Sequence, residues 1–573
     1  MNASDTQRAP VGPRAALATQ RGPIWIVGVF SVFVNLLMLT GPIFALQVYD
    51  RVLSSRSQET LVALTLLMVF LFIVMGIIDH MRKRISARIG ERIVSQIEKP
   101  VFDAALRSAP TSADRARHLQ DLETVRQFFA SSVFTAIFDL PWIPVFLLAI
   151  ALFHPALGWL ALFGAVIFLL PVLQIFSRRR SGQTSDEPQF VQAKRLANQA
   201  MADPEMIRVF HLEKPVIGRW QAWQQQARHA AIAVQDRRAA MNSAGLTLRL
   251  FLQSATIALG AYLVLQNQLT PGAIIAATVL LARALGPLNM IGQNWLMLRG
   301  ALQGWRRTTL LLANHPARTA AQNATAPGAG LEVQRATIFA PGARQATLRL
   351  INFSAPPGQV VGVIGPSGSG KTTLLMALAG LWPLTDGQIR LGDLPVSPPG
   401  ANAAHQIGLL PQTPGFLQGT IQENIARFQP DTDPHDVTRA AIHAGAHDHI
   451  LSLSRAYDTP LEPRNNPLAA GLIQRIALAR AIFSDPDFLL LDEPGNNLDG
   501  AGMSALSEIV QAARSAGKTV VIATQRPSSL QNCDLLLVLQ NGMQQDFGAV
   551  GKVLETTVKN VQPIRVAQSR ASG

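Results

Sequence analysis

The sequence predicts an α-helical domain of six membrane spans, followed by an α/β domain built around a glycine-rich loop. Apolar residues make up 48% of the 573 residues and charged residues only 15%, a balance too apolar for a soluble protein of this size. Six apolar stretches in the first half are each long enough to cross a bilayer, which takes about 20 residues. In the second half, β-branched runs such as VVGVIG and TVVIAT alternate with helical stretches, as in a largely parallel sheet.

The six spans form three pairs, and a short connection joins the two members of each pair. The spans are predicted at 23–49, 60–78, 131–153, 155–176, 245–266 and 271–298. Longer charged and helix-rich segments, 80–107 and 177–215, connect one pair to the next. The sequence therefore predicts two long helical extensions outside the membrane.

Basic residues follow the second and the fourth span directly. These clusters are Arg82, Lys83 and Arg84, and then Arg178, Arg179 and Arg180. Because positive charge marks the cytoplasmic side of membrane proteins, both extensions and both termini are predicted to be cytoplasmic. The first 22 residues carry neither an apolar core nor a cleavage site, so they are predicted to be a cytoplasmic tail and not a signal peptide.

The net charge of +14 has two interpretations. It could indicate a nucleic-acid partner, but in a membrane protein the positive-inside bias explains it more simply. We therefore expect a lipid bilayer and no nucleic acid among the partners. The single cysteine, Cys533, excludes an internal disulfide framework and a four-cysteine zinc site.

The domain boundaries follow from changes in composition. Residues 313–330 are small, contain Pro and Gly and lack periodicity, which is typical of a linker. The predicted segments are a tail at 1–22, the membrane domain at 23–312, the linker at 313–330, the α/β domain at 331–560 and a C-terminal tail at 561–573.

The stretch GPSGSGKT has the pattern of a phosphate-binding loop, G-x-x-x-x-G-K-[ST], and lies between a strand-like and a helix-like segment. Glycines let successive backbone N–H groups converge on phosphate oxygens, and the helix N-terminus adds a favourable dipole. Lys371 would reach the β- and γ-phosphates, and Thr372 would bind Mg²⁺. The predicted ATP-binding residues are Gly365, Pro366, Ser367, Gly368, Ser369, Gly370, Lys371, Thr372 and Thr373.

Two carboxylates end the apolar run FLLLDE. Asp492 at the strand end suits the coordination shell of Mg²⁺, and Glu493 suits a base that orients the attacking water. The alternative is a strand followed by an acidic turn. Together with the phosphate loop, the run favours a nucleotide site with ATP and Mg²⁺ as cofactors.

These motifs, in this order, resemble those of ATP-binding-cassette (ABC) exporter half-transporters over essentially the whole chain. ALQVYDRVLSSRSQETLVALT, DLETVRQFF, FDLPWIPVF and GAIIAATVLLARALGP are similar to the type I protein secretion exporters of the metalloprotease and haemophore (PrtD/HasD-like) group. LDEPGNNLD resembles that group's form of the Walker B and D-loop stretch, with Asp499 at the D-loop. The resemblance also implies that Gln412 contacts the metal and the attacking water; otherwise it is an ordinary loop glutamine.

The resemblance implies an ATP-driven export component of the bacterial inner membrane that works as a dimer, either with itself or with a paralogous half-transporter. It also implies a periplasmic adaptor (membrane fusion protein), a TolC-like outer-membrane channel and a secreted protein cargo. The alternatives are a catalytically weak or regulatory half of a heterodimeric exporter, and an exporter of small molecules or lipids with the same fold.

The chain departs from the family pattern at the signature loop, LSGGQ, which caps the γ-phosphate of ATP held by the other subunit. Here its positions are occupied by Leu468, Ala469, Ala470, Gly471 and Leu472. Ala469 has no hydroxyl, Ala470 carries a Cβ where the backbone must approach closely, and Leu472 cannot form a hydrogen bond. The sequence predicts a weakened cap.

Two further departures concern the same nucleotide. Gln525 stands where the family has the histidine that holds the γ-phosphate and water. The aromatic residue that stacks on adenine aligns with Ala340, and strand alternation would turn the neighbouring Phe339 the other way. A hydrogen bond to a charged group is worth roughly 1.5–3 kcal/mol, so each lost contact predicts hydrolysis about ten- to a hundredfold slower.

ATP binding is therefore expected with weak hydrolysis by the chain alone. One explanation is a heterodimer whose other half carries an intact signature loop and histidine. The other is drift within a homodimer that tolerates slow turnover.

Three charged residues fall inside predicted spans: Asp139, Arg249 and Arg283. Charges inside a membrane indicate a functional site, here the translocation path. Pairing within the helical bundle, or side chains that extend to the interface, is an equal alternative.

Overall fold

The computed structural model describes residues 12–108, 112–177, 187–316, 330–343, 345–392, 394–396, 407–463, 467–525 and 530–560. The chain divides into two compact units between residues 317 and 318. Most of the predicted linker and C-terminal tail, and the first eleven residues of the predicted N-terminal tail, lie outside the described residues.

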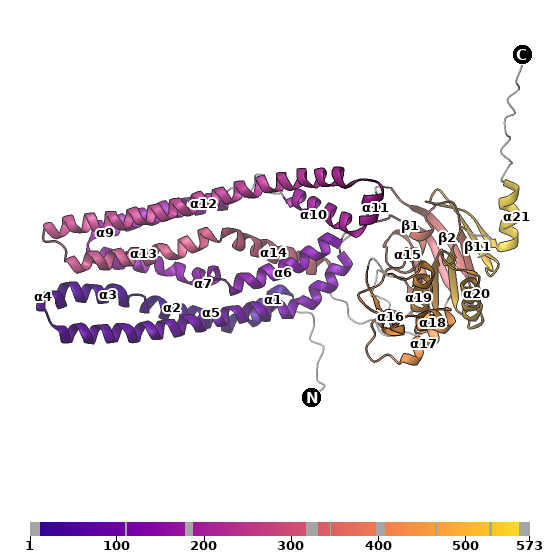
Figure 1. The fold of residues 1–573 in the computed structure, drawn as a ribbon, viewed down its shortest axis with the longest axis horizontal. Coiled ribbons are helices and arrows are strands. Elements are labelled where there is room, and N and C mark those ends of the chain that lie inside the picture. Colours follow the sequence, from indigo (N-terminus) through magenta and orange to yellow (C-terminus); the bar gives the residue numbers. More distant parts are fainter. Residues whose placement is uncertain are drawn as a thin grey trace, which may run out of the picture. The chain divides into compact units, whose positions relative to one another are not determined.

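The first unit is built of helices, of which α5 and α12 are the longest and run along most of its length (Figure 1). The α-helices are α1 (Pro13–Thr19), α2 (Arg21–Leu37), α3 (Thr40–Gln47), α4 (Leu53–Ser55), α5 (Gln58–Ser108), α6 (Ser112–Ala130), α7 (Ser132–Asp139), α8 (Ile143–Phe153), α9 (Pro155–Ser177), α10 (Glu187–Ala202), α11 (Pro204–Val209), α12 (Glu213–Leu265), α13 (Pro271–Gln293) and α14 (Trp295–Asn314). A π-helical turn, η1 (Val48–Val52), and a 3₁₀ turn, η2 (Leu140–Trp142), interrupt them.

The helices account for all six predicted spans. Five stretches are long and apolar enough to cross a membrane, namely Arg21–Ser55, Gln58–Ser108, Ser132–Phe153, Asn242–Leu265 and Pro271–Gln293. The remaining predicted span, 155–176, corresponds to the 23-residue apolar helix α9. Large apolar side chains on the first half of α5 are exposed, as expected of a surface that faces lipid; examples are Leu66 and Phe70.

Three spans that were predicted as continuous are interrupted in the structure. In the first, α2 ends at Leu37, because Pro42 donates no hydrogen bond and its ring collides with the carbonyl four residues earlier. In the third, Pro141 lies within the 3₁₀ turn η2. In the sixth, α13 ends at Gln293 and α14 begins at Trp295.

The residues of the first basic cluster are partly buried and paired, while their predicted cytoplasmic side stays a prediction. Arg82 is 4% exposed and forms ion pairs with Asp79 and Asp139, so it does not face the cytoplasm as a free charge. Lys83 also pairs with Asp79, while Arg84 is exposed. The second cluster, 178–180, lies outside the described residues.

The second unit has a ten-stranded sheet in the order β5-β4-β1-β2-β12-β11-β3-β10-β9-β6. Its strands are β1 (Leu331–Ile338), β2 (Leu348–Ala355), β3 (Val360–Ile364), β4 (Leu384–Leu391), β5 (Leu394–Pro395), β6 (Ile407–Leu410), β9 (Phe488–Asp492), β10 (Thr519–Ala523), β11 (Leu535–Gln540) and β12 (Met543–Ala549). A two-stranded sheet pairs β7 (Gly419–Thr420) with β8 (Pro460–Leu461).

The sheet is parallel from β11 to β6, as predicted for this domain. Strands β1, β2, β4 and β5, and the pair β11–β12, are joined by antiparallel pairings, which the prediction of a largely parallel sheet did not include. The antiparallel strands lie at one side of the sheet, so the parallel half alone forms the edge discussed below.

Helices cover both faces of the parallel half. The helices of this unit are α15 (Lys371–Leu378), α16 (Ile421–Ile425), α17 (Pro434–His443), α18 (His447–Leu451), α19 (Ala470–Ile482), α20 (Gly500–Ser515) and α21 (Val550–Asn560), with a 3₁₀ turn η3 (Ala456–Asp458). Of these, α15, α19 and α20 pack on the parallel strands. Alternate residues of β9 pack into different cores: Leu490 joins the core with α15, and Leu489 and Leu491 join the core with α19 and α20. Burial on both faces explains why these strands are apolar without alternation.

Candidate functional site

Four neighbouring parallel strands end at the same edge of the sheet. Val363 on β3 pairs with Ala523 on β10, and Ala523 pairs with Asp492 on β9. On the other side of β9, Leu491 pairs with Leu410 on β6. The residues that follow these ends come from distant parts of the sequence, yet strand pairing brings them to one edge, where ligands bind in open parallel sheets. They are the phosphate loop, Gln525, Glu493 and Gln412.

The phosphate loop connects β3 to α15, and two of its glycines are required by their surroundings. A Cβ on Gly365 would collide with the carbonyl oxygen of Leu539 on β11. Gly370, the N-cap of α15, has a φ of 102°, and a Cβ there would overlap the Leu348 side chain. The loop is therefore held tightly against the sheet, with the N-terminus of α15 at its end.

The side chains of the loop divide into buried and exposed groups. Lys371, Ser369 and Thr373 are buried. The Lys371 ammonium donates to the carbonyl oxygens of Gly365 and Pro366, at 2.9 and 3.0 Å, so the loop curls around its own lysine. The exposed members, which form the outer surface of the loop, are Pro366, Ser367 and Gly368, and Thr372 is half-buried.

Asp492 is 1% exposed, and neither of its carboxylate oxygens has a hydrogen-bond partner among the residues that the structure describes. Burial raises the pKa of Asp492 above its usual range, and the neighbouring Glu493 acts in the same direction. The Thr372 hydroxyl and the Lys371 ammonium lower the pKa and oppose this shift. A buried carboxylate with unused oxygens beside a threonine hydroxyl is an oxygen-rich donor set of the kind that Mg²⁺ prefers, so these residues fit the metal.

Glu493 is held in a defined position by its backbone and by two side-chain amides. Its φ of 50° is unusual for a residue with a side chain, and its N–H donates to the Ala523 carbonyl oxygen at 2.8 Å. The Gln525 amide donates to Glu493 Oε1 at 2.9 Å, and the Asn496 amide donates to Oε2 at 3.3 Å. The side chains of Gln525 and Asn496 thus orient the carboxylate group of Glu493.

Asn496 is a residue that sequence reasoning did not select. It lies three residues after Glu493 in the DEPGNN stretch, and its backbone N–H also donates to the Glu493 carbonyl oxygen. The position of Asn496, three residues after the predicted base Glu493, is the sequence feature by which it could have been predicted.

Gln412 lies at the same sheet edge but stands apart from the other groups. It follows β6 by two residues and is exposed. Its position beside the end of β9 comes from the pairing of β6 with β9, and its side chain projects from a loop and not from the core.

The signature segment forms the loop before α19 and the first turn of that helix. Ala469 is the N-cap of α19 and makes no side-chain cap hydrogen bond, whereas a serine at this place can accept from the first free N–H groups. Gly471 lies close to the backbone of Asn497, since a Cβ on Gly471 would be 2.9 Å from its carbonyl oxygen. Leu468 and Leu472 pack against the neighbouring core.

Hydrogen bonds and an ion pair connect the start of α19 to the segment after β9. The Gln474 amide donates to the Pro494 carbonyl oxygen at 3.2 Å. Arg475, which sequence reasoning missed, is buried and pairs with Asp499. Asp499 also caps α20 by accepting from the Gly502 N–H at 2.8 Å, and this bond, with the charge of Arg475, lowers the pKa of Asp499. The signature and D-loop segments are therefore joined within one chain.

Phe339 lies outside strand β1, contrary to the sequence-based expectation. Strand β1 ends at Ile338, so the alternation of side chains along a strand does not extend to Phe339 or Ala340. Phe339 is among the exposed large apolar residues. Strand alternation therefore gives no reason to exclude it from the nucleotide.

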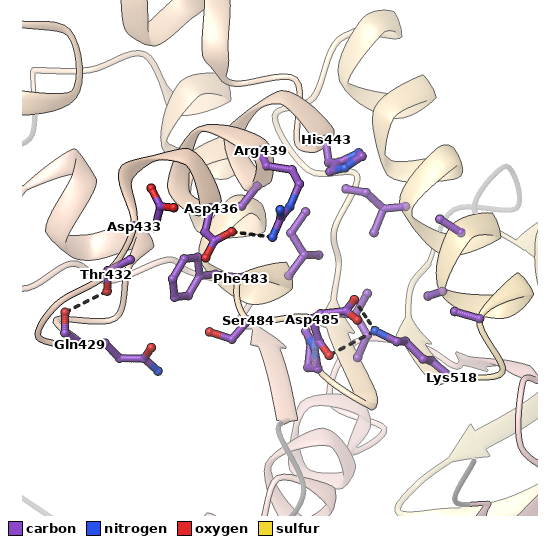
Figure 2. A pocket seen from close by; sticks show the side chains of 18 of the residues that line it. Gln429, Thr432, Asp433, Asp436, Arg439, His443, Phe483, Ser484, Asp485 and Lys518 are labelled. Atoms are coloured by element: carbon purple, nitrogen blue, oxygen red, sulfur yellow. Dashed lines mark hydrogen bonds and ion pairs between the residues drawn. The ribbon is translucent and has the colours of Figure 1, made fainter. Parts of the chain in front are cut away.

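A separate cavity of about 1110 Å³ lies away from the phosphate loop, at the opposite ends of the strands (Figure 2). Its walls come from α17, α20 and the turn before β9. Arg439 points to Asp436, and Lys518 points to Asp485, so the charged groups at these positions are paired within the wall. No residue of the predicted nucleotide site lines this cavity.

A phosphate loop and an adjacent carboxylate pair at the ends of parallel strands make the second unit an ATP-binding domain, and the same chain carries a helical membrane domain. This combination is typical of membrane transport ATPases. Comparison with known proteins shows to which family of transport ATPases the chain belongs. Residues 348–496 match the family model described as ABC transporter, and residues 24–288 match the one described as ABC transporter transmembrane region.

The type I secretion system ATP-binding protein PrsD of Rhizobium meliloti (strain 1021) is 34% identical to this chain, over 96% of the chain and 95% of the relative. The chain belongs to the ABC transporter family, whose members bind and hydrolyse ATP and are integral membrane proteins.

More distant relatives cover most of the chain as well. The alpha-hemolysin translocation ATP-binding protein HlyB of Proteus vulgaris is 28% identical over 90% of this chain and 74% of that protein. The leukotoxin translocation ATP-binding protein LktB of Mannheimia glucosida is 25% identical over 92% of this chain and 76% of that protein. Among solved structures, a bacterial Atm1-family ABC exporter with ATP bound has the same fold, with a TM-score of 0.79 at 20% identity, covering 95% of this chain and all of the other.

Replacing Asp492 by Asn removes a buried, unpaired charge, so Asp492→Asn should raise the thermal unfolding midpoint of the nucleotide-free protein. An unsatisfied buried polar group costs about 1–3 kcal/mol, and each kcal/mol corresponds to about 2–4 °C in a domain of this size. Because the pKa of Asp492 is raised in the fold, wild-type stability falls as the pH rises through that pKa, and the variant lacks this fall.

The measurement is a series of thermal scans of the purified full chain from acidic to neutral pH. Asp487→Asn, one residue before β9 and at the other end of that strand, is the matched control and should leave the pH slope unchanged. A lower midpoint for Asp492→Asn at neutral pH, or an unchanged slope, would contradict the assignment of a buried free carboxylate.

Proposed function

We propose that the chain is the ATP-driven membrane component of a type I secretion system and exports a protein cargo from the cytoplasm. The convergence of the phosphate loop, Asp492 and Glu493 at one sheet edge, on a chain with a helical membrane unit, carries this proposal. The printed names of the relatives, which include a type I secretion protein at 34% identity and two toxin translocation proteins, support a protein cargo.

In this proposal residues 23–312 form the membrane domain and residues 331–560 the nucleotide domain. The backbone N–H groups of the loop from Gly365 to Gly370, with the N-terminus of α15, bind the phosphates of ATP. Lys371 leaves its two loop carbonyls and neutralises charge on the outer phosphates. Thr372 and Thr373 complete the end of the loop.

Asp492, Thr372 and Gln412 would hold Mg²⁺, which supplies charge neutralisation on the phosphate oxygens. Glu493 accepts a proton from the attacking water. Gln525 and Asn496 fix the direction of its carboxylate, each through one oxygen. Gln525 can donate a hydrogen bond to a phosphate oxygen or to Glu493, but it cannot carry the positive charge of a histidine.

The exposed face of the signature segment supports slow hydrolysis by the chain alone. A half-transporter presents Leu468, Ala469, Ala470, Gly471 and Leu472 to ATP held by its partner. Ala469 leaves the N-terminus of α19 without a side-chain cap, so the helix dipole and free N–H groups are the main attraction left for a phosphate. In a homodimer both sites share this defect.

We therefore favour a heterodimer with a paralogous half-transporter that has an intact signature loop and histidine. Each composite site would then combine one altered part with one intact part. A homodimer with slow turnover is the alternative, and the activity of the purified chain distinguishes them. In either case the chain would lie in the bacterial inner membrane with its nucleotide domain in the cytoplasm, and would work with a periplasmic adaptor and a TolC-like channel.

Restoring the family residues should accelerate hydrolysis by the chain alone. The variant Ala469→Ser, Ala470→Gly, Leu472→Gln with Gln525→His should raise the ATPase rate of the purified chain at least about tenfold. Each recovered hydrogen bond to the charged phosphate is worth roughly 1.5–3 kcal/mol, which corresponds to about ten- to a hundredfold in rate. The affinity for ATP should change little, because the phosphate loop is untouched.

Adding Glu493→Gln to the restored variant is the control, and it should return the rate to background. Steady-state phosphate release against ATP concentration separates the effects on kcat and KM. An unchanged rate in the restored variant would show that the signature loop does not limit hydrolysis. Brisk turnover by the unmodified chain would contradict the preference for a heterodimer.

A protein cargo predicts a change in the secreted proteins when ATP binding is lost. In the native host, Lys371→Ala should remove one or a few proteins from the medium, because the outer phosphates lose their cation. Mass spectrometry of the culture medium makes the measurement, with the exposed Arg455→Ala in the same domain as a control that retains secretion. An unchanged set of secreted proteins would favour an exporter of small molecules or lipids.

A further inference from the structure

A cavity of about 670 Å³ with several charged residues in its wall lies within the membrane unit. Residues of α2, α5, α7, α12 and α13 form its walls, and Figure 1 shows these helices running along the unit. The charged residues that line it are Asp79, Arg82, Lys83, Asp139, Arg249 and Arg283. Four cations against two carboxylates leave the wall with a net charge of +2.

One side of the cavity neutralises its own charges. The buried Arg82 guanidinium donates to Asp139 at 2.9 Å and to Asp79 at 2.8 Å. Lys83 pairs with Asp79 at 2.7 Å, and the Asn35 amide donates to Asp139 at 2.7 Å. Both carboxylates on α5 and α7 are therefore occupied by the two cations of α5.

The opposite side of the cavity is different. Arg249 on α12 and Arg283 on α13 line the same space, and neither forms an ion pair with any residue that the structure describes. Gln253 lies one turn after Arg249, on the same face of α12, and also lines the cavity. The excess positive charge of the cavity therefore belongs to Arg249 and Arg283.

Both arginines lie inside their spans. Arg283 is near the middle of Pro271–Gln293, whereas Arg249 is nearer the start of Asn242–Leu265. At about 1.5 Å per residue, Arg249 is roughly 24 Å from the C-terminus of α12, and Arg283 is roughly 18 Å from the N-terminus of α13. A short connection joins these two helix ends. Pro287 lines the cavity too, and because it has no N–H, it leaves the carbonyl of Arg283 without its helical partner.

An unpaired guanidinium at this depth is unfavourable unless water or an anion satisfies it. In the structure the Asp79 and Asp139 carboxylates pair with Arg82 and Lys83, and not with Arg249 or Arg283. The five donors of a guanidinium match the two oxygens of a carboxylate. Gln253 can both donate and accept, which suits the peptide groups of an extended chain.

We propose that Arg249 and Arg283 form a binding site for the carboxylate side chains of an extended polypeptide in the membrane cavity. This inference rests on the proposed export of a protein cargo, and it names acidic segments of that cargo as the ligand. Arg82 contributes indirectly: by occupying Asp79 and Asp139, it keeps these carboxylates from pairing with the two arginines.

The test uses the full chain in nanodiscs of phosphatidylcholine, without nucleotide. The probe is a fluorescent Gly/Ser-rich peptide that carries several glutamates, compared with the same peptide carrying glutamines. Fluorescence anisotropy should show the glutamate peptide binding at least about tenfold more tightly, with an affinity that falls as salt is added. Arg249→Gln combined with Arg283→Gln should remove this preference.

Two controls keep the test specific. Arg228→Gln, an exposed arginine on α12 outside the cavity, should leave the preference intact. Arg249→Lys with Arg283→Lys keeps the charge and should retain part of the preference, which separates lost charge from a folding defect. If the glutamine variant does not fold, the affinity of the wild type for the glutamate peptide at increasing salt gives a second measurement. An affinity that does not fall with salt would contradict the proposal.

Equal affinities for the two peptides, or an unchanged preference in the glutamine variant, would overturn the proposal. A lipid ligand would overturn it as well, and would show itself as phosphatidylglycerol that co-purifies with the wild type and not with the glutamine variant. The assay needs neither ATP nor secretion, so it tests carboxylate binding separately from protein export. A chain that binds the glutamate peptide but exports no protein would contradict the proposed function and not the carboxylate site. A chain that secretes protein without any preference for glutamate would contradict this inference alone.

Discussion

The common end of four parallel strands is the constraint on which the nucleotide site depends. Pairing of β3, β10, β9 and β6 sets the distances among the phosphate loop, Gln525, Glu493 and Gln412 before any ligand is present. The strands are buried on both faces, so a shift of one residue would move apolar side chains out of two cores at once. The same register places Asp492 in the interior, where its carboxylate oxygens accept no hydrogen bond from the described part of the chain. The fold thus holds the Asp492 carboxylate in a buried position that is unfavourable for a negative charge. At the same position the carboxylate could bind Mg²⁺.

The parts of this arrangement that local sequence determines could be predicted. The glycine pattern of the phosphate loop, the apolar run before Asp492 and the lengths of the spans all follow from neighbouring residues. The interruptions at Pro42 and Pro141 were also visible, but span length alone does not show where a helix breaks. Contacts between distant residues could not be predicted. Arg82 looked like a cytoplasmic charge because its partner Asp139 lies 57 residues away, and Asn496 became relevant only when its amide was seen at Glu493.

The two faces of the nucleotide domain differ in what they retain. The face that would hold ATP in this chain has its loop, its buried carboxylate and an oriented glutamate. The face that would cap the ATP of a partner has Gly471 packed against Asn497 and Arg475 paired with Asp499, but it has no hydroxyl at Ala469. In the membrane unit, charges pair on one wall of the cavity, and the two arginines on the other wall form no ion pair with a described residue. Charge there is also arranged by long-range pairing.

The most direct test of this account measures bound nucleotide and released phosphate in one sample of the purified full chain, as Mg²⁺ is varied. The account predicts about one ATP bound per chain at roughly millimolar concentrations, dependence on Mg²⁺, and phosphate release that is slow compared with binding. Failure to retain ATP with Mg²⁺ at these concentrations would contradict the account at its base, since the residues at the strand ends would then not form a nucleotide site.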